Sequence, residues 1–364
     1  MIILIILPLG FLNFPVSIAN SGEAARTYIF SSSVVYINRY NSSLSLGEEY
    51  RLFNLFMNTS WQTVYLLNSS HSFKIDRDFD GNLVIMLSTP SMSSGENLSM
   101  KVSLKIVTKQ RSPPSLSLSA SGPLQNISSE FQNYTGKAGS WLTDNHTLKD
   151  LAYEIKGDKT NILEIVTSFT DWIGNNILAK SSDVPLYPTE TFDLRQGDCD
   201  DQANLLITLC RIVGIPAYLQ VGLLEKSTQE KETFWNGHVT YSTIHVGYHG
   251  WAMVYVSPWG WLPFDMTLGW KKIDPLAVVK SAWIYRSTSA QIMDITKTDW
   301  AGEGRAEKEN VSRSQLYMLF EDSLVEEQLG SWIGSLYQNW QILTITIIII
   351  LTIAVYWIRR YFIR

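Results

Sequence analysis

The chain has 364 residues, a length that suggests two or three domains and allows a full-sized hydrophobic core. Its net charge of -5 and its lack of basic clusters in the body argue against nucleic acid as a partner. Two cysteines, placed far from any metal-ligand spacing, exclude a disulfide scaffold and argue against a zinc ribbon.

Residues 1–18 are almost entirely apolar, and they lead into Ser17-Ile18-Ala19, a small-x-small pattern typical of a signal-peptide cleavage site. The positively charged start of an ordinary signal peptide is missing. We therefore expect residues 1–19 to be a signal peptide or, alternatively, a retained N-terminal anchor.

Residues 20–112 are rich in Ser and Thr and contain short alternating strands. The clearest is 101–108, where Val102, Leu104 and Ile106 share one face. Further strands are expected at 27–37, 61–67 and 83–87. Short strands separated by turns predict an all-β, sandwich-like domain.

The dipeptide Asp80-Gly81 predicts a hairpin between residues 73–79 and 82–87. Asp76, Asp78 and Asp80 also have the spacing of a calcium loop, but its twelfth position would be Leu87 rather than a bidentate Glu. The plain hairpin is favoured, with calcium as the alternative.

Several Asn-x-Ser/Thr sequons precede residue 150, and one follows later; these fit an exported, glycosylated surface. They lie at Asn41, Asn58, Asn68, Asn97, Asn126, Asn133, Asn145 and Asn310.

Residues 113–147, which begin with Pro113-Pro114, form a polar connector. Helices are expected at 148–155 and 162–177. Trp172, in the second helix, either lines the site or is an ordinary packing aromatic.

A helix that starts at Cys199 is the clearest element of the chain. The apolar residues Ala203, Leu206 and Cys210 follow at helical spacing, and Asp198 is a good N-cap. Gly214 ends the helix. A helix start favours a thiolate, but neighbouring aspartates oppose this, so the thiol needs a partner base.

Residues 226–236 are charged, and we expect a surface loop there. The strand 248–256 carries His249 on the same face as Trp251, and a second short strand, 261–267, carries Asp265. Such a Cys, His and Asp form a nucleophile, a base and an orienting carboxylate. A metal site built from His238, His245 and His249 is the alternative.

The motifs GDCDDQANLLITLCRIVGIPAYLQVG, HGWAMVYV and GWLPFDMT resemble, in order and spacing, those of the transglutaminase-like superfamily. That resemblance implies an α+β, papain-like domain in which Cys199 is the nucleophile, His249 the general base and Asp265 the orienting residue. Gly250 departs from the family's usual Ala, a change expected to matter little. Cys210 is expected to be core. Being about 16 Å along the helix from Cys199, it is too far for a disulfide, whose Cα atoms lie within ~7 Å.

Residues 296–313 resemble a linker in composition, and apolar residues from Leu316 to Leu329 suggest a juxtamembrane amphipathic helix. Residues 340–358 predict a transmembrane helix, and the arginines that follow place the tail 359–364 in the cytoplasm.

The predicted organisation is a leader (1–19), a β domain (20–112), a connector (113–147), the catalytic domain (148–290), a linker with a juxtamembrane helix (291–338), a membrane span and a cytoplasmic tail. The predicted protein is an exported, membrane-anchored cysteine enzyme that hydrolyses amide or peptide bonds of an extracellular protein or peptide. It needs no cofactor or metal. The alternatives are an amine-transferring transglutaminase and a non-catalytic binding module of the same fold.

Overall fold

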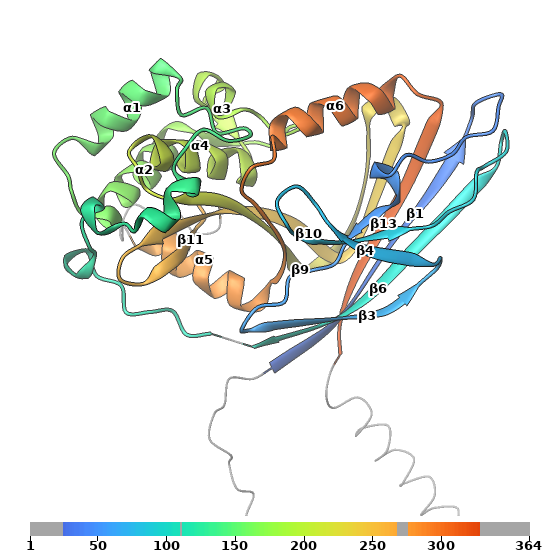
Figure 1. Cartoon of the computed structure of the whole chain (residues 1–364), viewed down its shortest axis with the longest axis horizontal. Helices are drawn as coiled ribbons and strands as arrows, with labels where there is room; N and C mark the ends of the chain where they lie inside the picture. The colour runs from blue at the N-terminus through green and yellow to red at the C-terminus, as the bar shows by residue number, and fades with distance from the viewer. Residues whose placement is uncertain (1–24, 110, 268–275, 328–364) are drawn as a thin grey trace, which may run out of the picture.

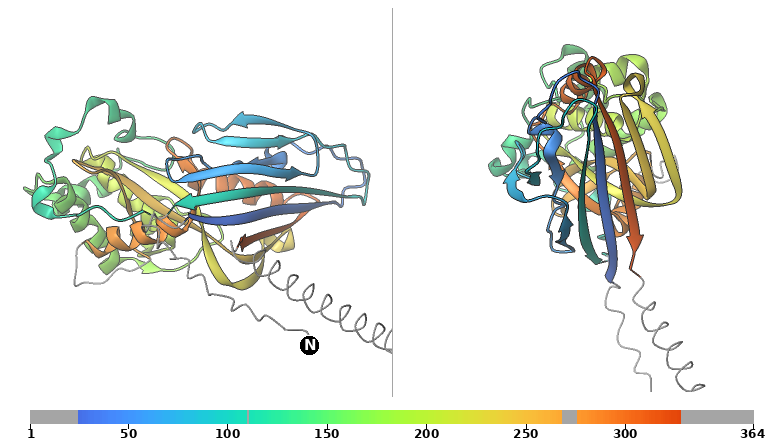
Figure 2. Two further views of the ribbon diagram at one scale, coloured as in Figure 1. Left: turned by 90° about the horizontal axis from the view of Figure 1, so that it is seen from below. Right: turned by 90° about the vertical axis from the view of Figure 1, so that its right-hand side faces the viewer.

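The alternating segments of the chain become strands of one curved sheet in the computed structural model, which describes residues 25–109, 111–267 and 276–327. Most of the helices gather at one end of this sheet, and its long strands extend toward the other end (Figures 1 and 2). The strands are β1 (Ala25–Asn38), β3 (Gln62–Ser69), β6 (Asn97–Lys109), β9 (Ala217–Phe234), β10 (Val239–Val256), β11 (Gly260–Phe264), β12 (Ala290–Ile295) and β13 (Leu316–Glu326).

The strand order is β12-β9-β10-β13-β1-β6-β3, with β11 paired to β10. All of these neighbours are antiparallel except β10 and β13. A three-stranded sheet has the order β2-β5-β4, and β7 pairs with β8. These shorter strands are β2 (Leu52–Asn54), β4 (Phe73–Arg77), β5 (Leu83–Leu87), β7 (Leu178–Ala179) and β8 (Gln196–Gly197).

The predicted strand 101–108 is confirmed as part of β6. Val102, Leu104 and Ile106 are buried, whereas Lys101 is exposed. The hairpin of β4 and β5 is also confirmed, with Gly81 at a positive φ of 93° in its turn. The Asp80 carboxylate accepts hydrogen bonds from the loop after β12, so the hairpin turn anchors that loop.

The region 20–112 is rich in strands, as predicted, but it is not a separate sandwich-like domain. Its strand β1 pairs with β6 on one side and with β13 on the other, and β13 then pairs with β10. The boundary expected at residue 112 therefore does not divide two sheets.

The predictions for the linker and the juxtamembrane helix were wrong. Within 296–313 lies the helix α6 (Trp300–Ser312), and the apolar residues after it form β13 in the middle of the sheet. The predicted loop 226–236 was also wrong, because most of it continues β9 and pairs with the first half of β10. The side chains of this segment are exposed to solvent, which is compatible with their charge.

The helices predicted at 148–155 and 162–177 and the helix beginning at Cys199 are confirmed. The connector holds short 3-10 turns, the longest at Ser129–Tyr134. The helices are α1 (His146–Lys156), α2 (Ile162–Asn176), α3 (Pro188–Leu194), α4 (Cys199–Ile212), α5 (Ala277–Thr288) and α6.

The predicted leader 1–19 and the transmembrane helix 340–358 lie outside the described residues. Among the residues that are described, no helix has the length and apolar character needed to cross a bilayer. The two ends of the described chain lie side by side, because the Glu327 amide donates to the Thr27 carbonyl at 2.7 Å (Figure 1).

Candidate active site

The predicted nucleophile, Cys199, is the first residue of α4, which packs against β9 and β10. Nearly every residue of α4 after its first turn is buried, so the helix is held on all sides. Cys199 is half-buried, whereas Cys210 is fully buried in the core, as predicted. Gly214, at a positive φ of 85°, follows the helix and lets the chain turn toward β9.

His249 and Asp265 form a tight buried pair. His249 lies on β10 and Asp265 directly follows β11, and His249 Nε2 is 2.5 Å from Asp265 Oδ2. The residues are 9% and 3% exposed. The other oxygen, Asp265 Oδ1, accepts hydrogen bonds from the Thr267 amide and hydroxyl at 2.9 and 2.7 Å. The carboxylate is thus fixed, and Nδ1 is the ring nitrogen left to exchange a proton.

The residue after the histidine connects this pair to the cysteine. The Gly250 backbone N–H hydrogen-bonds the Cys199 sulfur, and the Asp265 carboxylate is near enough to influence the pKa of the thiol. The three predicted site residues therefore lie in one neighbourhood, although they come from a helix, a strand and a strand end.

The backbone at Gly250 leaves little room for a side chain. A Cβ on this residue would lie 2.9 Å from the Cβ of Asp200, closer than such atoms pack without movement. The departure from the family's usual Ala thus allows the start of α4 to approach β10 at the site itself.

The pKa of the Cys199 thiol is raised. Burial is the largest cause, the Asp200 carboxylate adds to it, and the Gly250 N–H opposes it. Burial also raises the pKa of Asp198 to about 9 and that of Asp201 to about 6, with Asp200 contributing to both. Burial, together with the acidic first turn, therefore outweighs the helix-terminus effect that would favour a thiolate.

The ligand atoms of Asp198, Cys199 and Asp200 lie within 4.8 Å of one another, which makes them the one potential metal cluster within the described residues. Asp200 already accepts a hydrogen bond from an indole, and burial raises the pKa of Asp198, so neither is poised as a free carboxylate ligand. In the alternative histidine cluster, both ring nitrogens of His238 face backbone carbonyls, at 2.9 and 3.1 Å. The absence of a required metal remains a prediction.

Trp300 is a site residue that sequence reasoning missed. It is the first residue of α6, and its Nε1 donates to Asp200 Oδ2 at 2.6 Å. The one local signal was Asp299, a good N-cap in a stretch whose composition indicated a linker. Trp172 instead stacks on Phe192, with ring centroids 5.8 Å apart, which supports the packing interpretation.

A second missed feature is a buried polar chain behind the histidine. The Trp251 indole donates to Gln220 Oε1, and Gln220 Nε2 donates to Asp294 Oδ1. The Trp251 and His249 rings are 6.1 Å apart. These hydrogen bonds hold Trp251 in place on β10, the strand that also carries His249.

Comparison with known proteins relates the region that carries these residues to a known superfamily. The sequence profile of the transglutaminase-like superfamily matches residues 149–266. A crystal structure of a candidate cysteine protease from Cytophaga hutchinsonii aligns with a TM-score of 0.51 at 18% identity, over 84% of this chain and 90% of that one. At this identity the similarity concerns the fold alone: a transglutaminase-like fold of mixed helix and strand content with a β-rich N-terminal region.

A candidate protease from Parabacteroides distasonis gives a TM-score of 0.24 at 12% identity, over 69% of this chain and 65% of that one. No curated protein sequence matches the chain.

Proposed function

Residues 149–266 form a transglutaminase-like superfamily domain, and from this premise we propose that the protein is a cysteine enzyme that hydrolyses peptide or amide bonds through a thioester. The observation that carries the proposal is the hydrogen-bonded His249–Asp265 pair beside Cys199, linked to it through the Gly250 N–H. A non-catalytic binding module would not need a buried, oriented imidazole at a helix start that carries a thiol.

The raised pKa of Cys199 defines the first step. The thiol is neutral at rest, so His249 Nδ1 takes its proton as the sulfur attacks the carbonyl carbon. Asp265 then stabilises the imidazolium through Nε2. The carbonyl π electrons move to oxygen, and we assign the Cys199 backbone N–H as one donor to that oxyanion.

Collapse of the tetrahedral species breaks the C–N bond, and His249 returns its proton to the leaving amine. Water then attacks the Cys199 thioester while His249 accepts a proton from it. The C–S bond breaks, His249 returns the proton to the sulfur, and the carboxylic acid and the free thiol are released. In the second candidate function, a primary amine replaces water in this step and the product is a new amide. We favour hydrolysis because amine transfer requires a site that excludes water.

We further propose that the enzyme is exported and anchored by residues 340–358, with an extracellular protein or peptide as substrate. In support, Thr27 and Glu327, close to the two ends of the described residues, are joined by a backbone hydrogen bond, so both ends of the described part lie on the same side of the molecule. Protease added to intact cells should degrade everything except roughly the last 25 residues. Protection of the Cys199 domain would contradict this topology.

The test of the chemistry uses matched cysteine variants on a peptide library, with and without a primary amine. Cys199→Ala should reduce turnover at least ~10³-fold. Cys210→Ala removes the other thiol of α4, which lies away from the site. This variant should retain turnover and lose ~1 kcal/mol of stability. Acid products in the presence of amine indicate hydrolysis, and amide products indicate transfer. Turnover that survives Cys199→Ala would overturn the enzyme assignment.

A further inference from the structure

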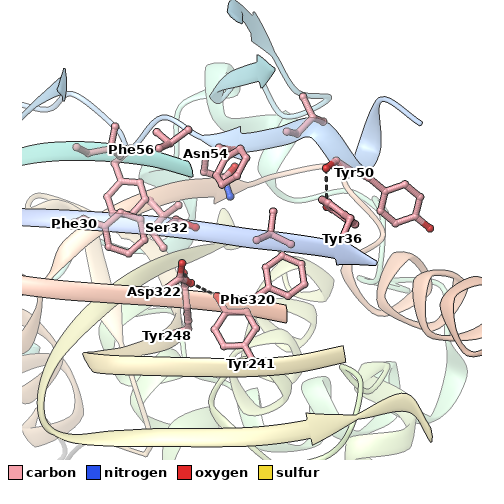
Figure 3. A pocket seen from close by; sticks show the side chains of 16 residues that line it. Phe30, Ser32, Tyr36, Tyr50, Asn54, Phe56, Tyr241, Tyr248, Phe320 and Asp322 are labelled. Carbon is pink, nitrogen blue, oxygen red and sulfur yellow. Dashed lines mark hydrogen bonds between the residues drawn. The ribbon is translucent and has the colours of Figure 1, made fainter. Parts of the chain in front are cut away.

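A cavity of about 170 Å³ lies away from the cysteine site, between the large sheet and the segment around β2 (Figure 3). Its walls come from β1, β6, β10, β12 and β13 on one side and from residues 50–56 on the other. Most of the wall is apolar or aromatic. The residues that matter for the inference are Phe30, Phe56, Tyr241, Tyr248, Phe320 and Asp322.

One carboxylate is buried in this cavity. Asp322 is 1% exposed and lies on β13, directly across from Ser32 of β1. The Tyr241 and Tyr248 hydroxyls both donate to its Oδ2. Its other oxygen, Oδ1, is buried and has no hydrogen-bond partner among the described residues. The residues that line the cavity include no Lys or Arg.

A β-bulge creates this arrangement. Tyr241 and Tyr248 are seven positions apart, and in a regular strand they would point to opposite faces. The register of β10 shifts at His245, which has a φ of 59°, and the extra residue returns both tyrosines to one face. Because of the bulge, the hydroxyls of Tyr241 and Tyr248 can both donate to Asp322 Oδ2.

Leaving a carboxylate oxygen buried without a partner is costly, and burial raises the pKa of Asp322. The two tyrosines, and the Ser32 hydroxyl that lies near the carboxylate without a hydrogen bond to Oδ1, lower this pKa but only partly offset the effect of burial. A cation with an N–H donor would supply both the missing hydrogen bond and the missing countercharge.

The aromatic rings around the carboxylate suit such a cation. Tyr241 and Phe320 are stacked with centroids 5.4 Å apart, and Tyr241 and Tyr248 meet edge to face. Their π faces attract cations. Two of the residues that line the cavity, Leu52 and Tyr248, are 39% and 44% exposed, so its lining extends to the protein surface.

We propose that this cavity is a binding site for a primary ammonium group on a short apolar chain, such as an alkylamine or a lysine side chain. The N–H groups reach Asp322 Oδ1, and the chain lies among Phe30, Phe56 and Phe320. The volume equals roughly five to six water molecules, which suits such a group. The site is independent of the proposed cysteine chemistry.

The test is a ligand-observed NMR titration of the full chain with n-butylammonium, n-butanol and tetramethylammonium at neutral pH. We expect saturable binding of n-butylammonium with Kd of order millimolar, and binding of the other two at least ~10-fold weaker. Equal binding of butanol would indicate a merely apolar cavity. Equal binding of tetramethylammonium would indicate an aromatic cage that makes no use of Asp322 Oδ1. Either result, or no binding of n-butylammonium, overturns the proposal.

Variants locate the site. Asp322→Asn, which keeps the shape of the side chain and removes its charge, should weaken the binding of n-butylammonium at least ~10-fold. The matched control is Glu321→Gln, one residue away and exposed, which should change Kd less than ~2-fold. If Asp322→Asn does not fold, Phe320→Leu provides the test. It should weaken the binding of n-butylammonium ~3-fold and leave the binding of n-butanol unchanged. Equal effects of Asp322→Asn and Glu321→Gln would indicate non-specific attraction and overturn the proposal, as would an unchanged Kd in Phe320→Leu.

Discussion

Three aspartates surround the thiol at the first turn of α4. A helix start ordinarily lowers the pKa of a cysteine there. Here burial and Asp200 raise it, and Asp200 is itself held by the Trp300 indole. The residue environment therefore keeps Cys199 neutral until a base removes its proton, and that base is His249 in our proposal.

Replacing Asp200 tests this electrostatic account. Asp200→Asn removes the negative charge while its amide oxygen can still accept from Trp300, so the pKa of Cys199 should fall. Alkylation of Cys199 by iodoacetamide at pH 7 should become several-fold faster, as followed by mass spectrometry. Asp150→Asn, an exposed change on α1, is the control and should leave the rate unchanged. A slower reaction in Asp200→Asn would contradict the account.

Asp198 should make stability depend on pH. Burial raises its pKa to about 9 in the folded chain, from 3.8. Between these values the folded state binds more protons than the unfolded state, so this contribution is fully present below about pH 4 and is lost as pH rises toward 9.

The neutral variant Asp198→Asn should therefore become more stable relative to the parent protein as pH rises. Its Tm relative to the parent should be higher at pH 8 than at pH 5 by ~2 °C or more in thermal unfolding. Asp150→Asn again supplies the control. A difference in Tm that does not change between the two pH values would refute the buried, protonated Asp198.

At the scale of elements, the site depends on how closely α4 approaches β10. The approach is closest at Gly250, which faces Asp200 and whose N–H contacts the thiol. The start of α6 holds the other side of the same turn through Trp300. The first turn of α4 is thus fixed between a strand and a helix that are distant in sequence.

Gly250→Ala should disturb this contact. The added Cβ would push the start of α4 from β10, and turnover should fall ~10-fold or more, because small misplacements of reacting groups are costly. Gly136→Ala is the matched control, since a Cβ there meets nothing within 4 Å. Comparable turnover in both variants, measured at saturating peptide, would show that the close approach is unimportant.

At the scale of the whole molecule, the β-rich N-terminal region and the transglutaminase-like domain share a sheet. Residues 149–266 are about a third of the chain, whereas the alignment to the Cytophaga hutchinsonii structure covers 84% of it. The strand β13 joins the two parts, because it lies between β1 and β10.

Truncation tests this organisation. A chain that ends at residue 315 loses β13, which exposes the edges of β1 and β10 and the apolar side chains beneath, and it should be unfolded or aggregated. A chain that ends at residue 327 keeps β13 and should unfold in one cooperative transition by calorimetry. Two separate transitions, or a folded chain without β13, would favour independent domains.

The sequence by itself determined the features whose cause is local. The start of α4 at Cys199, the alternation along 101–108 and the turn at Asp80-Gly81 depend on near neighbours in the chain, and all three are found. The motifs also singled out Cys199, His249 and Asp265, which the structure brings into one neighbourhood. Their roles remain our proposal.

The tertiary structure alone decided the rest. The apolar spacing from Leu316 onward fits a helix as well as a strand, and only the free edges of β1 and β10 select the strand. The charged segment 229–234 is a strand because it pairs with β10, whatever its side chains. Trp300 reaches Asp200, and two tyrosines reach Asp322, across long separations in sequence. Such contacts are invisible to local patterns, because hydrogen-bond and packing partners come from distant parts of the chain.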